Sequence, residues 1–388
     1  MKVAIIGAGI AGAAAAFEIA RQGGRATVIH DLTGSSGLYS GALDLEPWDR
    51  AGHTSALAPG LTEFSEQLGA WQLSAAPRCV ATLEGNVRPT RGSDRALLDL
   101  ERCVGKRVAV VDLERDDWDA PLLAKSFASS AWARRTQTDF FAAPAAVLQN
   151  GFERRISGYD FAALHDAPER AQVLQKALRE SSVRADAWLF GPWLGIERAL
   201  AEELSAALGV PVGETTSAPG GASGARFENM RDRLLPKIAD VTRGRLTRLE
   251  REGNGYRLHW RDRSPEQFSI VVLATGGVAA GGVALERSFE RRGGTGFRLS
   301  FASPLALELD SEVVEGVSSL ASVDFVERGL GALLKVGIAT RADGSAPDHP
   351  GIFVAGDAIA GRPRTALMAA LSGFQAARSA LAYGRRSV

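Results

Sequence analysis

The sequence is poor in cysteine and has no excess of charge of either sign. Its two cysteines, Cys79 and Cys103, are too few for a four-thiolate iron–sulfur centre or a cysteine-rich zinc site, so we expect no metal in this chain. Lysine and arginine total 45 residues, and aspartate and glutamate also total 45. This balance shows neither the basic footprint of a nucleic-acid-binding protein nor a polybasic patch for a membrane surface.

Long apolar runs are also missing. No uncharged apolar stretch reaches the roughly 18 residues of a membrane span, and the first apolar run lacks the basic segment and small-residue cleavage site of a signal peptide. We therefore expect a cytoplasmic protein, with peripheral attachment to the inner membrane through a partner as the alternative. At 388 residues the chain is long for one hydrophobic core, which predicts two domains.

Residues 1–31 predict a strand, a glycine turn, a helix and a second strand in direct succession. The apolar run from Lys2 to Ile6 is too short for a helix and stops at Gly7, which indicates a buried parallel strand. A helix is expected from Ile10 to about Gln22, ended by two glycines, and a second strand from Ala26 to His30.

The glycine turn has the G-x-G-x-x-G spacing of a dinucleotide site. Gly7 permits the tight turn, Gly9 lets the backbone approach a pyrophosphate, and Gly12 lets the helix pack closely on the strand. Backbone N–H groups at Ile10 and Ala11 begin the helix and would face the phosphates.

The end of the second strand departs from the usual pattern. A carboxylate normally binds the ribose hydroxyls there, whereas this chain has His30, with Asp31 next to it as a substitute. An ordinary histidine at a strand end is the alternative interpretation of His30.

The loop 32–45 is dense in small and hydroxyl residues. We expect it to wrap a flavin, with Ser40, Gly41 and Ala42 at the cofactor, because leaving Leu38, Tyr39, Leu43 and Leu45 in water would be costly. A flexible surface loop is the alternative.

Two later segments have the strand-and-turn pattern of the other cofactor-binding segments of an FAD enzyme. A buried strand over 269–273 ends in Ala274, Thr275 and Gly276, and a strand over 351–355 runs into Gly356 and Asp357. A small-residue helix from Thr365 to Tyr383 follows, and its start would stabilise a reduced, anionic flavin. With the N-terminal turn, these segments favour FAD over a simple NAD-binding domain.

Residues 50–185 carry no chemical motif and are expected to form a separate lobe. A strand over 107–112 and a helix over 168–179 are predicted there, and Trp118, Trp132, Phe140 and Phe141 are read as core aromatics. Further helices are expected from Glu197 to Leu208 and from near Arg226, and a hairpin over 245–260.

Several segments together resemble the B subunit of anaerobic glycerol-3-phosphate dehydrogenase, within the fumarate-reductase-like FAD-dependent oxidoreductase group. In order along the chain, the segments are 40–45, 195–229, 272–277 with 281–282 and 286–287, and 336–340. The resemblance implies oxidation of glycerol 3-phosphate to dihydroxyacetone phosphate, with catalytic and membrane-anchored iron–sulfur partner subunits that pass electrons to quinone. The family is usually described with FMN in this subunit, whereas the pyrophosphate turn here argues for FAD.

The predicted fold class is α/β, a two-domain flavoprotein of the FAD-binding Rossmann type with a discontinuous FAD domain. The expected division gives the FAD-binding domain residues 1–50, 186–284 and 336–388, and gives a substrate or cap domain residues 51–185 and 285–335.

Catalytic residues are less evident than cofactor-binding ones. Arg362 and Arg364, beside the expected flavin ring, could hold an anionic substrate, as could Arg226, with solvated surface arginines as the alternative. His349 is the candidate for a base, although Asp348-His349-Pro350 also resembles a turn. The alternatives in function are an FAD-dependent dehydrogenase of another small-molecule substrate and a flavin-binding, non-catalytic electron-relay subunit.

Overall fold

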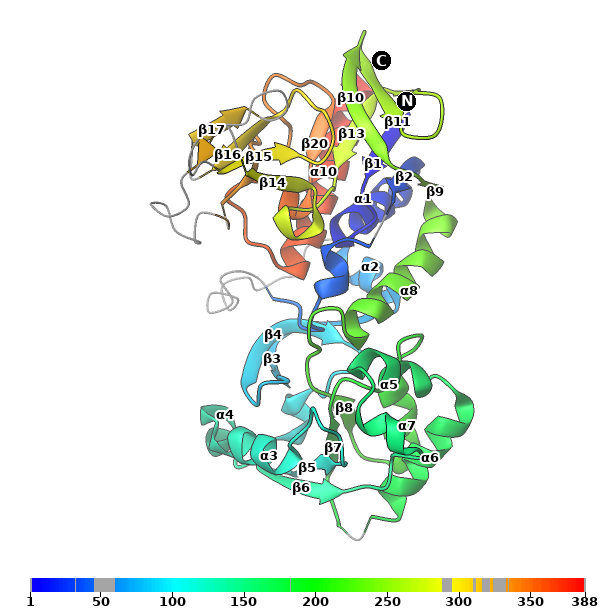
Figure 1. Cartoon of the computed structure of the whole chain (residues 1–388), viewed down its shortest axis with the longest axis vertical. Coiled ribbons are helices and arrows are strands. Elements are labelled where there is room, and N and C mark those ends of the chain that lie inside the picture. The colour runs from blue at the N-terminus through cyan, green and yellow to red at the C-terminus, as the bar shows by residue number, and fades with distance from the viewer. Residues whose placement is uncertain are drawn as a thin grey trace. The chain divides into compact units, whose positions relative to one another are not determined.

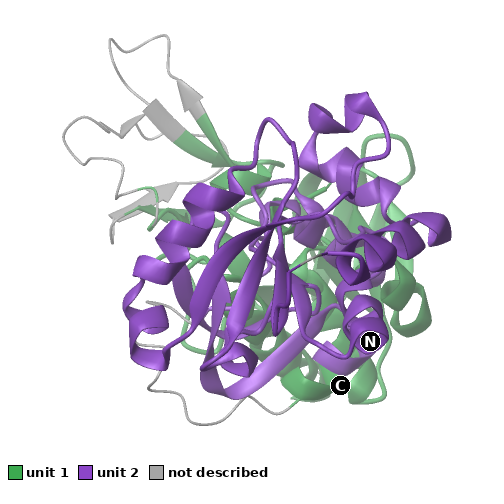
Figure 2. Ribbon diagram, turned by 90° about the horizontal axis from the view of Figure 1, so that it is seen from below, with its two compact units in different colours: residues 1–36, 58–64, 231–388 green, residues 37–57, 65–230 purple. Residues whose placement is uncertain are grey.

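The computed structural model describes residues 2–31, 33–44, 60–181, 183–287, 295–309, 312–315, 322–323, 333 and 335–386. Leu45, at the end of the predicted flavin loop, lies outside these residues. The chain forms two units (Figure 2): unit 1 contains 1–36, 58–64 and 231–388, and unit 2 contains 37–57 and 65–230. No described helix is long and apolar enough to cross a membrane.

A parallel five-stranded sheet forms the centre of unit 1 (Figure 1). Strand β1 (Val3–Ile6) lies between β13 (Ile270–Leu273) and β2 (Ala26–His30), and β20 (Ile352–Val354) and β9 (Asp240–Arg243) form the edges. The four residues of β1 and those of β13 are all buried, as expected for a strand covered on both faces. Because the strands are parallel, their carboxyl ends meet at one edge of the sheet.

Two helices of unit 1 pack on each other with their backbones close together. Helix α1 (Ile10–Arg21) is rich in alanine and ends where Gly23 adopts a φ of 78°, and α10 (Ala366–Arg386) lies against it. A side chain at Gly373 of α10 would overlap the carbonyl oxygen of Ala11.

Side chains extend this contact between the two helices. The rings of Phe17 and Phe64 lie 5.4 Å apart and those of Phe64 and Phe374 lie 5.8 Å apart. Arg378 of α10 donates a hydrogen bond of 2.8 Å to Glu18 of α1, whose carboxylate is fully buried. The sheet and its covering helices therefore form one packed body in unit 1.

Shorter antiparallel sheets complete unit 1 as described. Their strands are β10 (Leu246–Glu252), β11 (Gly255–Trp260) and β12 (Glu266–Phe268); β14 (Val283–Arg287), β15 (Thr295–Leu299) and β18 (Ser322–Val323); and β16 (Ala306–Leu309), β17 (Glu312–Glu315) and β19 (Gly337–Ile338). The β10–β11 pair confirms the hairpin expected over 245–260.

Unit 2 has its own parallel sheet and its own hydrophobic core. The sheet order is β6 (Asp139–Pro144), β5 (Arg107–Asp112), β7 (Ala187–Phe190) and β8 (Val212–Glu214), and β3 (Trp71–Ala81) pairs with β4 (Val87–Asp94) as a separate hairpin. Its helices are α3 (Ala120–Ser129), α4 (Ala131–Thr136), α5 (Gly158–Leu164), α6 (Pro168–Arg179) and α7 (Leu200–Leu208). The division between the units falls within α2 (Leu61–Leu68) and within α8 (Ala222–Ile238).

The core of unit 2 includes three of the four aromatics assigned to it from sequence. Trp118, Trp132 and Phe140 are buried, and Phe141 is half-buried against the same cluster. Helix α7 begins at Leu200, three residues later than expected from the sequence.

The two units differ from the expected domains at several segments, of which 186–230 and 285–335 are the longest. Residues 186–230 belong with unit 2, because β7 pairs with β5 and β8 pairs with β7 in the sheet of that unit. Residues 285–335 belong with unit 1, where the described part of that segment adds strands to its small sheets. A strand's own apolar pattern does not say which sheet it joins, so the sequence could not assign these segments.

We expect Gly373→Ala to destabilise unit 1. Its Cβ would overlap the Ala11 carbonyl, and forced overpacking costs about 1–3 kcal/mol of unfolding free energy. The measurement is chemical denaturation followed by circular dichroism. Gly151→Ala is the control, because a Cβ at Gly151 meets open space. Equal stabilities of the two variants would show that α1 can move away from α10 freely.

Candidate cofactor and substrate site

Three turns of unit 1 follow neighbouring parallel strands at the carboxyl edge of the sheet. They contain the glycine turn 7–12 after β1, residues 274–277 after β13, and Gly356 with Asp357 after β20. The crevice outside the carboxyl ends of parallel strands is where α/β folds bind ligands. The sequence-predicted cofactor residues of these turns therefore share one end of one sheet.

The glycine turn fits the role predicted for it. Gly7 has a φ of 108°, and a Cβ there would overlap the carbonyl of Ala274. A Cβ at Gly12 would overlap the carbonyl of Gly7. The amide of Gly7 donates to Ile29 of β2 at 2.8 Å, and the amide of Ala274 donates to Ile6 of β1 at 2.8 Å. Only glycine allows helix α1 to begin this close to both strands.

A serine next to this turn was not among the predicted site residues. The hydroxyl of Ser36 accepts a hydrogen bond of 2.9 Å from the amide of Ile10, the first residue of α1. A Cβ at Gly9 would lie 2.9 Å from the same hydroxyl oxygen. Ser36 belongs to the short 3-10 helix η1 (Ser35–Leu38), inside the hydroxyl-rich loop that the sequence associated with the flavin. The composition of the loop was the available signal, but it did not single out this serine.

Asp357, in the turn after β20, lies against the turn after β13. A Cβ at Gly277 would lie 2.7 Å from the Asp357 carbonyl oxygen, so only glycine fits there without displacement. Burial raises the pKa of Asp357, while Arg364 and a hydrogen bond with Ser35 oppose that rise. The amide of Gly356 donates 2.8 Å to the hydroxyl of Ser372 in α10. Asp357 is therefore fixed at the edge of the sheet by groups on either side of it.

One polar atom at this edge tests whether the site suits a dinucleotide. The hydroxyl oxygen of Thr275 is buried and has no hydrogen-bond partner among the described residues. A buried hydroxyl without a partner is costly and calls for a ligand or water. Helix α1 has no side-chain cap at Gly9, and together with Thr275 its N-terminus fits the pyrophosphate and adenylate of FAD.

The end of β2 is less acidic than in most dinucleotide sites. His30 is half-buried, and its pKa is lowered by burial and then by Arg231, against the opposite effects of Asp232 and Asp31. A neutral imidazole can accept one hydrogen bond from a ribose hydroxyl. Arg231 was not predicted from the sequence; it is buried and donates 3.2 Å to the carbonyl of Ala8, inside the glycine turn.

The predicted flavin-loop residues Ser40, Gly41 and Ala42 belong to unit 2, where they make structural contacts. The carbonyl of Ser40 accepts from the amide of Ser217 at 2.8 Å, and Ala42 bridges to Ser93. A Cβ at Gly41, whose φ is 100°, would lie 2.7 Å from both Leu97 and Ser223.

Of the apolar residues of the same loop, some are buried and one is exposed. Tyr39 and Leu43 are buried, whereas Leu38 is 47% exposed, so its contact with a flavin stays a prediction.

Arg226 is buried in an ion-pair network inside unit 2. Its Nε donates 3.1 Å to each carboxylate oxygen of Asp94, and its Nη2 donates 2.6 Å to Glu214. The carbonyl of Gly195 also accepts from its Nη1. Arg226 is 0% exposed, so the role of a substrate-binding arginine suggested by the sequence does not fit its position.

The network contains two carboxyl groups and one guanidinium. Burial raises the pKa of Glu214 to about 7, opposed by Arg226 and reinforced by Asp94. Burial also raises the pKa of Asp94, again opposed by Arg226. Although burial disfavours charge on Arg226, the two carboxylates raise its pKa. Burial, reinforced by the charge of Asp94, outweighs the shared guanidinium and keeps Glu214 protonated over part of the neutral range.

The remaining candidates lie at different ends of β20. His349 precedes this strand, and its carbonyl accepts from the amide of Ile352 at 3.1 Å, so it lies at the opposite end from Asp357. It is therefore not placed as a base for the predicted site. Arg364 follows the strand: its Nη2 donates 2.5 Å to the carbonyl of Val336, and its Nε is buried without a partner among the described residues. Arg362, two residues earlier, is half-buried.

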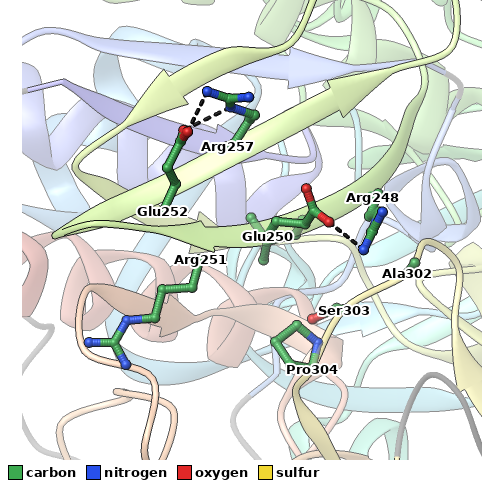
Figure 3. A pocket seen from close by; sticks show the side chains of 9 residues that line it. Arg248, Glu250, Arg251, Glu252, Arg257, Ala302, Ser303 and Pro304 are labelled. Atoms are coloured by element: carbon green, nitrogen blue, oxygen red, sulfur yellow. Dashed lines mark hydrogen bonds and ion pairs between the residues drawn. The ribbon is translucent and has the colours of Figure 1, made fainter.

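A surface groove of about 760 Å³ lies on the β10–β11 hairpin, away from these turns in the sequence. Figure 3 shows that Arg257 faces Glu252 and Arg248 faces Glu250, while Arg251 points away from both pairs. The other side of the groove is formed by residues 302–304. None of its lining residues belongs to the turns after β1, β13 or β20, so the groove is not part of the cofactor site.

Comparison with known proteins identifies the cofactor. Residues 2–169 match the family model described as an FAD binding domain, which includes the glycine turn and η1. No curated protein matches the chain. With the geometry of the glycine turn, this match shows that FAD is the cofactor. The α/β fold with an FAD-binding domain agrees with the sequence prediction.

Three solved structures with similarity to the chain are distant from it. Glycine oxidase from Geobacillus kaustophilus has 14% identity and a TM-score of 0.34, with 97% of this chain and 94% of that chain covered. Iminodiacetate oxidase from Chelativorans sp. BNC1 has 12% identity and a TM-score of 0.33, with 99% and 95% covered. The GidA-related protein from Thermus thermophilus has 14% identity and a TM-score of 0.32, with 98% of each covered. At these scores, no property of the three proteins is transferred to this chain.

We expect Gly9→Ala to weaken FAD binding about tenfold or more. The new methyl group would press on the Ser36 hydroxyl and shift it against the first amides of α1, which would bind the phosphate. A hydrogen bond to a charged group is worth about 1.5–3 kcal/mol. The dissociation constant is measured by titrating flavin-free protein with FAD. Gly34→Ala is the matched control, because a Cβ at Gly34 meets open space in the same loop. A similar loss in both variants would contradict the role assigned to Gly9.

The Arg226 network predicts a pH dependence of stability. Because the folded-state pKa of Glu214 is about 7, above the value of 4.5 of an unperturbed glutamate, the folded chain binds more protons between these values than the unfolded chain. Glu214 therefore makes the free energy of unfolding fall as pH rises through this window. In Glu214→Gln that contribution is lost, so the stability of the variant relative to the wild type should increase from pH 5 to pH 8.

Denaturant unfolding at several pH values measures this difference. Glu84→Gln, at an exposed position of the same unit, is the control and should give a difference that does not change with pH. A Glu214→Gln difference that is flat over the same range would mean that Glu214 is charged throughout it.

Proposed function

We propose that this chain is an FAD-dependent oxidoreductase that oxidises a small alcohol, with glycerol 3-phosphate as the leading substrate and dihydroxyacetone phosphate as the product, within a respiratory dehydrogenase complex. The observation that carries the proposal is the position of Arg364 beside Asp357, after the last strand of the FAD-binding sheet. The resemblance of segments 40–45, 272–277 and 336–340 to the B subunit of anaerobic glycerol-3-phosphate dehydrogenase supports the choice of substrate.

The residues at this edge suit an anionic substrate. Bound FAD supplies a hydride acceptor for the carbinol carbon. Arg364 is tied by one nitrogen to Val336 and has a second, buried nitrogen without a partner among the described residues, so it can donate to an entering phosphate oxygen. Arg362, half-buried two residues earlier, would add a second cation. Arginine suits this role because its planar group donates two parallel hydrogen bonds to phosphate.

Few groups of the three turns, as far as the structure describes them, could accept the proton of the substrate hydroxyl. Asp357 is the one carboxyl group among the described residues of the three turns, and these turns contain no histidine. This observation favours, as the second candidate, a subunit that binds FAD and relays electrons while a partner subunit performs the chemistry. An FAD-dependent dehydrogenase of another substrate would bind FAD at the same edge of the sheet, but it would not require an arginine that binds phosphate.

The test is anaerobic titration of the purified, FAD-loaded chain with glycerol 3-phosphate. The proposal expects the visible absorption of the flavin to bleach, with one dihydroxyacetone phosphate formed for each flavin reduced. Arg364→Met should raise the glycerol 3-phosphate concentration needed by about tenfold to a hundredfold, because one charge-assisted hydrogen bond is lost. Reduction by glycerol, which has no phosphate, should change little in this variant.

Two other results would count against the proposal. Bleaching by dithionite but not by glycerol 3-phosphate would support the relay subunit. Bleaching by a different, uncharged alcohol, with no effect of Arg364→Met, would support another dehydrogenase.

A further inference from the structure

Arg231 is a buried arginine beside the glycine turn that neither the sequence motif nor the family match assigns. It lies in α8, is 6% exposed, and donates through Nη1 to the carbonyl oxygen of Ala8 at 3.2 Å. Its Nε donates to the carboxylate of Asp232 at 2.9 Å. The guanidinium thus binds a backbone oxygen of the turn and a neighbouring carboxylate.

The charges around Arg231 differ from those of a usual ribose site. Where a carboxylate normally ends the second strand, this chain has His30, and β2 pairs with β9 so that His30 lies opposite Arg243. The pKa of His30 is lowered, by burial first and by Arg231 next, so the imidazole is neutral at pH 7. Two arginines, Arg231 and Arg243, and two aspartates, Asp31 and Asp232, therefore act on a neutral histidine.

These two arginines are not equivalent. The side chain of Arg231 is 8% exposed, whereas Arg243 is an exposed residue at the end of its strand. The side chain of Asp232, the partner of Arg231, is 44% exposed, so water screens its charge. The positive charge of Arg231 is less screened because the group itself is buried.

A cation at Ala8 offsets an unfavourable electrostatic interaction in the glycine turn. A pyrophosphate binds the turn through backbone N–H groups, but the carbonyl of Ala8 lies in the same turn and its negative end repels phosphate. A hydrogen bond from Arg231 to this carbonyl neutralises that repulsion and fixes the orientation of the peptide. The gain in binding free energy from this hydrogen bond depends on how much phosphate charge the ligand places at the turn.

We propose that Arg231 is a positioning residue through which the glycine turn selects a pyrophosphate-bearing flavin, FAD, over the monophosphate flavin FMN. Arg231 acts in two ways: its hydrogen bond orients the Ala8 peptide, and its own positive charge attracts the phosphates. The inference rests on FAD as the cofactor and is independent of the proposed substrate, since glycerol 3-phosphate oxidation could fail while this selection holds.

The experiment compares the affinities for two flavins in three variants of the full chain. Flavin is removed, and the apoprotein is titrated with FAD and with FMN while the quenching of flavin fluorescence is followed. Arg231→Met removes the charge and the donors, Arg231→Lys keeps the charge, and Arg243→Met removes an equal but exposed charge beside the same histidine. The thermal unfolding temperature of each apoprotein is recorded in parallel.

For Arg231→Met we expect the dissociation constant for FAD to rise about tenfold to a hundredfold, and that for FMN to change by less than about threefold. Arg231→Lys should recover most of the FAD affinity, and Arg243→Met should lose little. The loss in Arg231→Met should shrink with increasing salt, because part of it is the loss of charge attraction.

A purely structural role would give a different pattern. FAD and FMN would then weaken by the same factor, and the apoprotein unfolding temperature would fall in Arg231→Met and in Arg231→Lys alike. That pattern, or an equal loss of FAD affinity in Arg243→Met, would overturn the proposal. If Arg231→Met does not fold, Arg231→Lys is the deciding variant. A lower affinity of Arg231→Lys for both FAD and FMN, with the ratio of the two affinities unchanged, would also overturn the proposal.

Discussion

The close approach of backbone to backbone at the start of α1 is the constraint on which the cofactor site depends. Gly7 contacts the carbonyl of Ala274, Gly12 contacts Gly7, and Gly373 of α10 contacts Ala11. A methyl group at any of these glycines would separate elements that must touch. Because β1, β13 and α10 converge on the first turn of α1, the N–H groups of that turn and the Asp357 turn face the same edge of the sheet.

The parts of the fold predicted correctly from sequence are those whose signal is local. β1, α1 and β2 lie within 31 residues, and their order and glycines carry the information on their own. The same holds for the β10–β11 hairpin, for the strand before Thr275 and for the strand before Asp357. In each of these, an apolar run and the turn that closes it are adjacent in the chain, so no distant partner has to be known.

Local patterns are a poor guide where the outcome depends on distant partners. β7 has the apolar pattern of a buried strand, but its pairing with β5 is decided by the packing of unit 2. Ser36 is one of several hydroxyls in its loop, and only the fold brings it to the amide of Ile10. His349 is near β20 in the sequence and yet lies at the wrong end of it, because a strand separates residues that are only a few positions apart.

Arg226 and Arg231 show why residue type alone could not locate function. Both are buried arginines of α8, and nothing in their local sequence separates a structural arginine from one that serves a ligand. Arg226 is bound to two carboxyl groups that are themselves no more than 1% exposed, so its charge is neutralised within unit 2. Arg231 has a solvated carboxylate as its partner and a carbonyl of the glycine turn as its acceptor. The surroundings of a cation, rather than its burial, therefore decide whether its field reaches a bound anion.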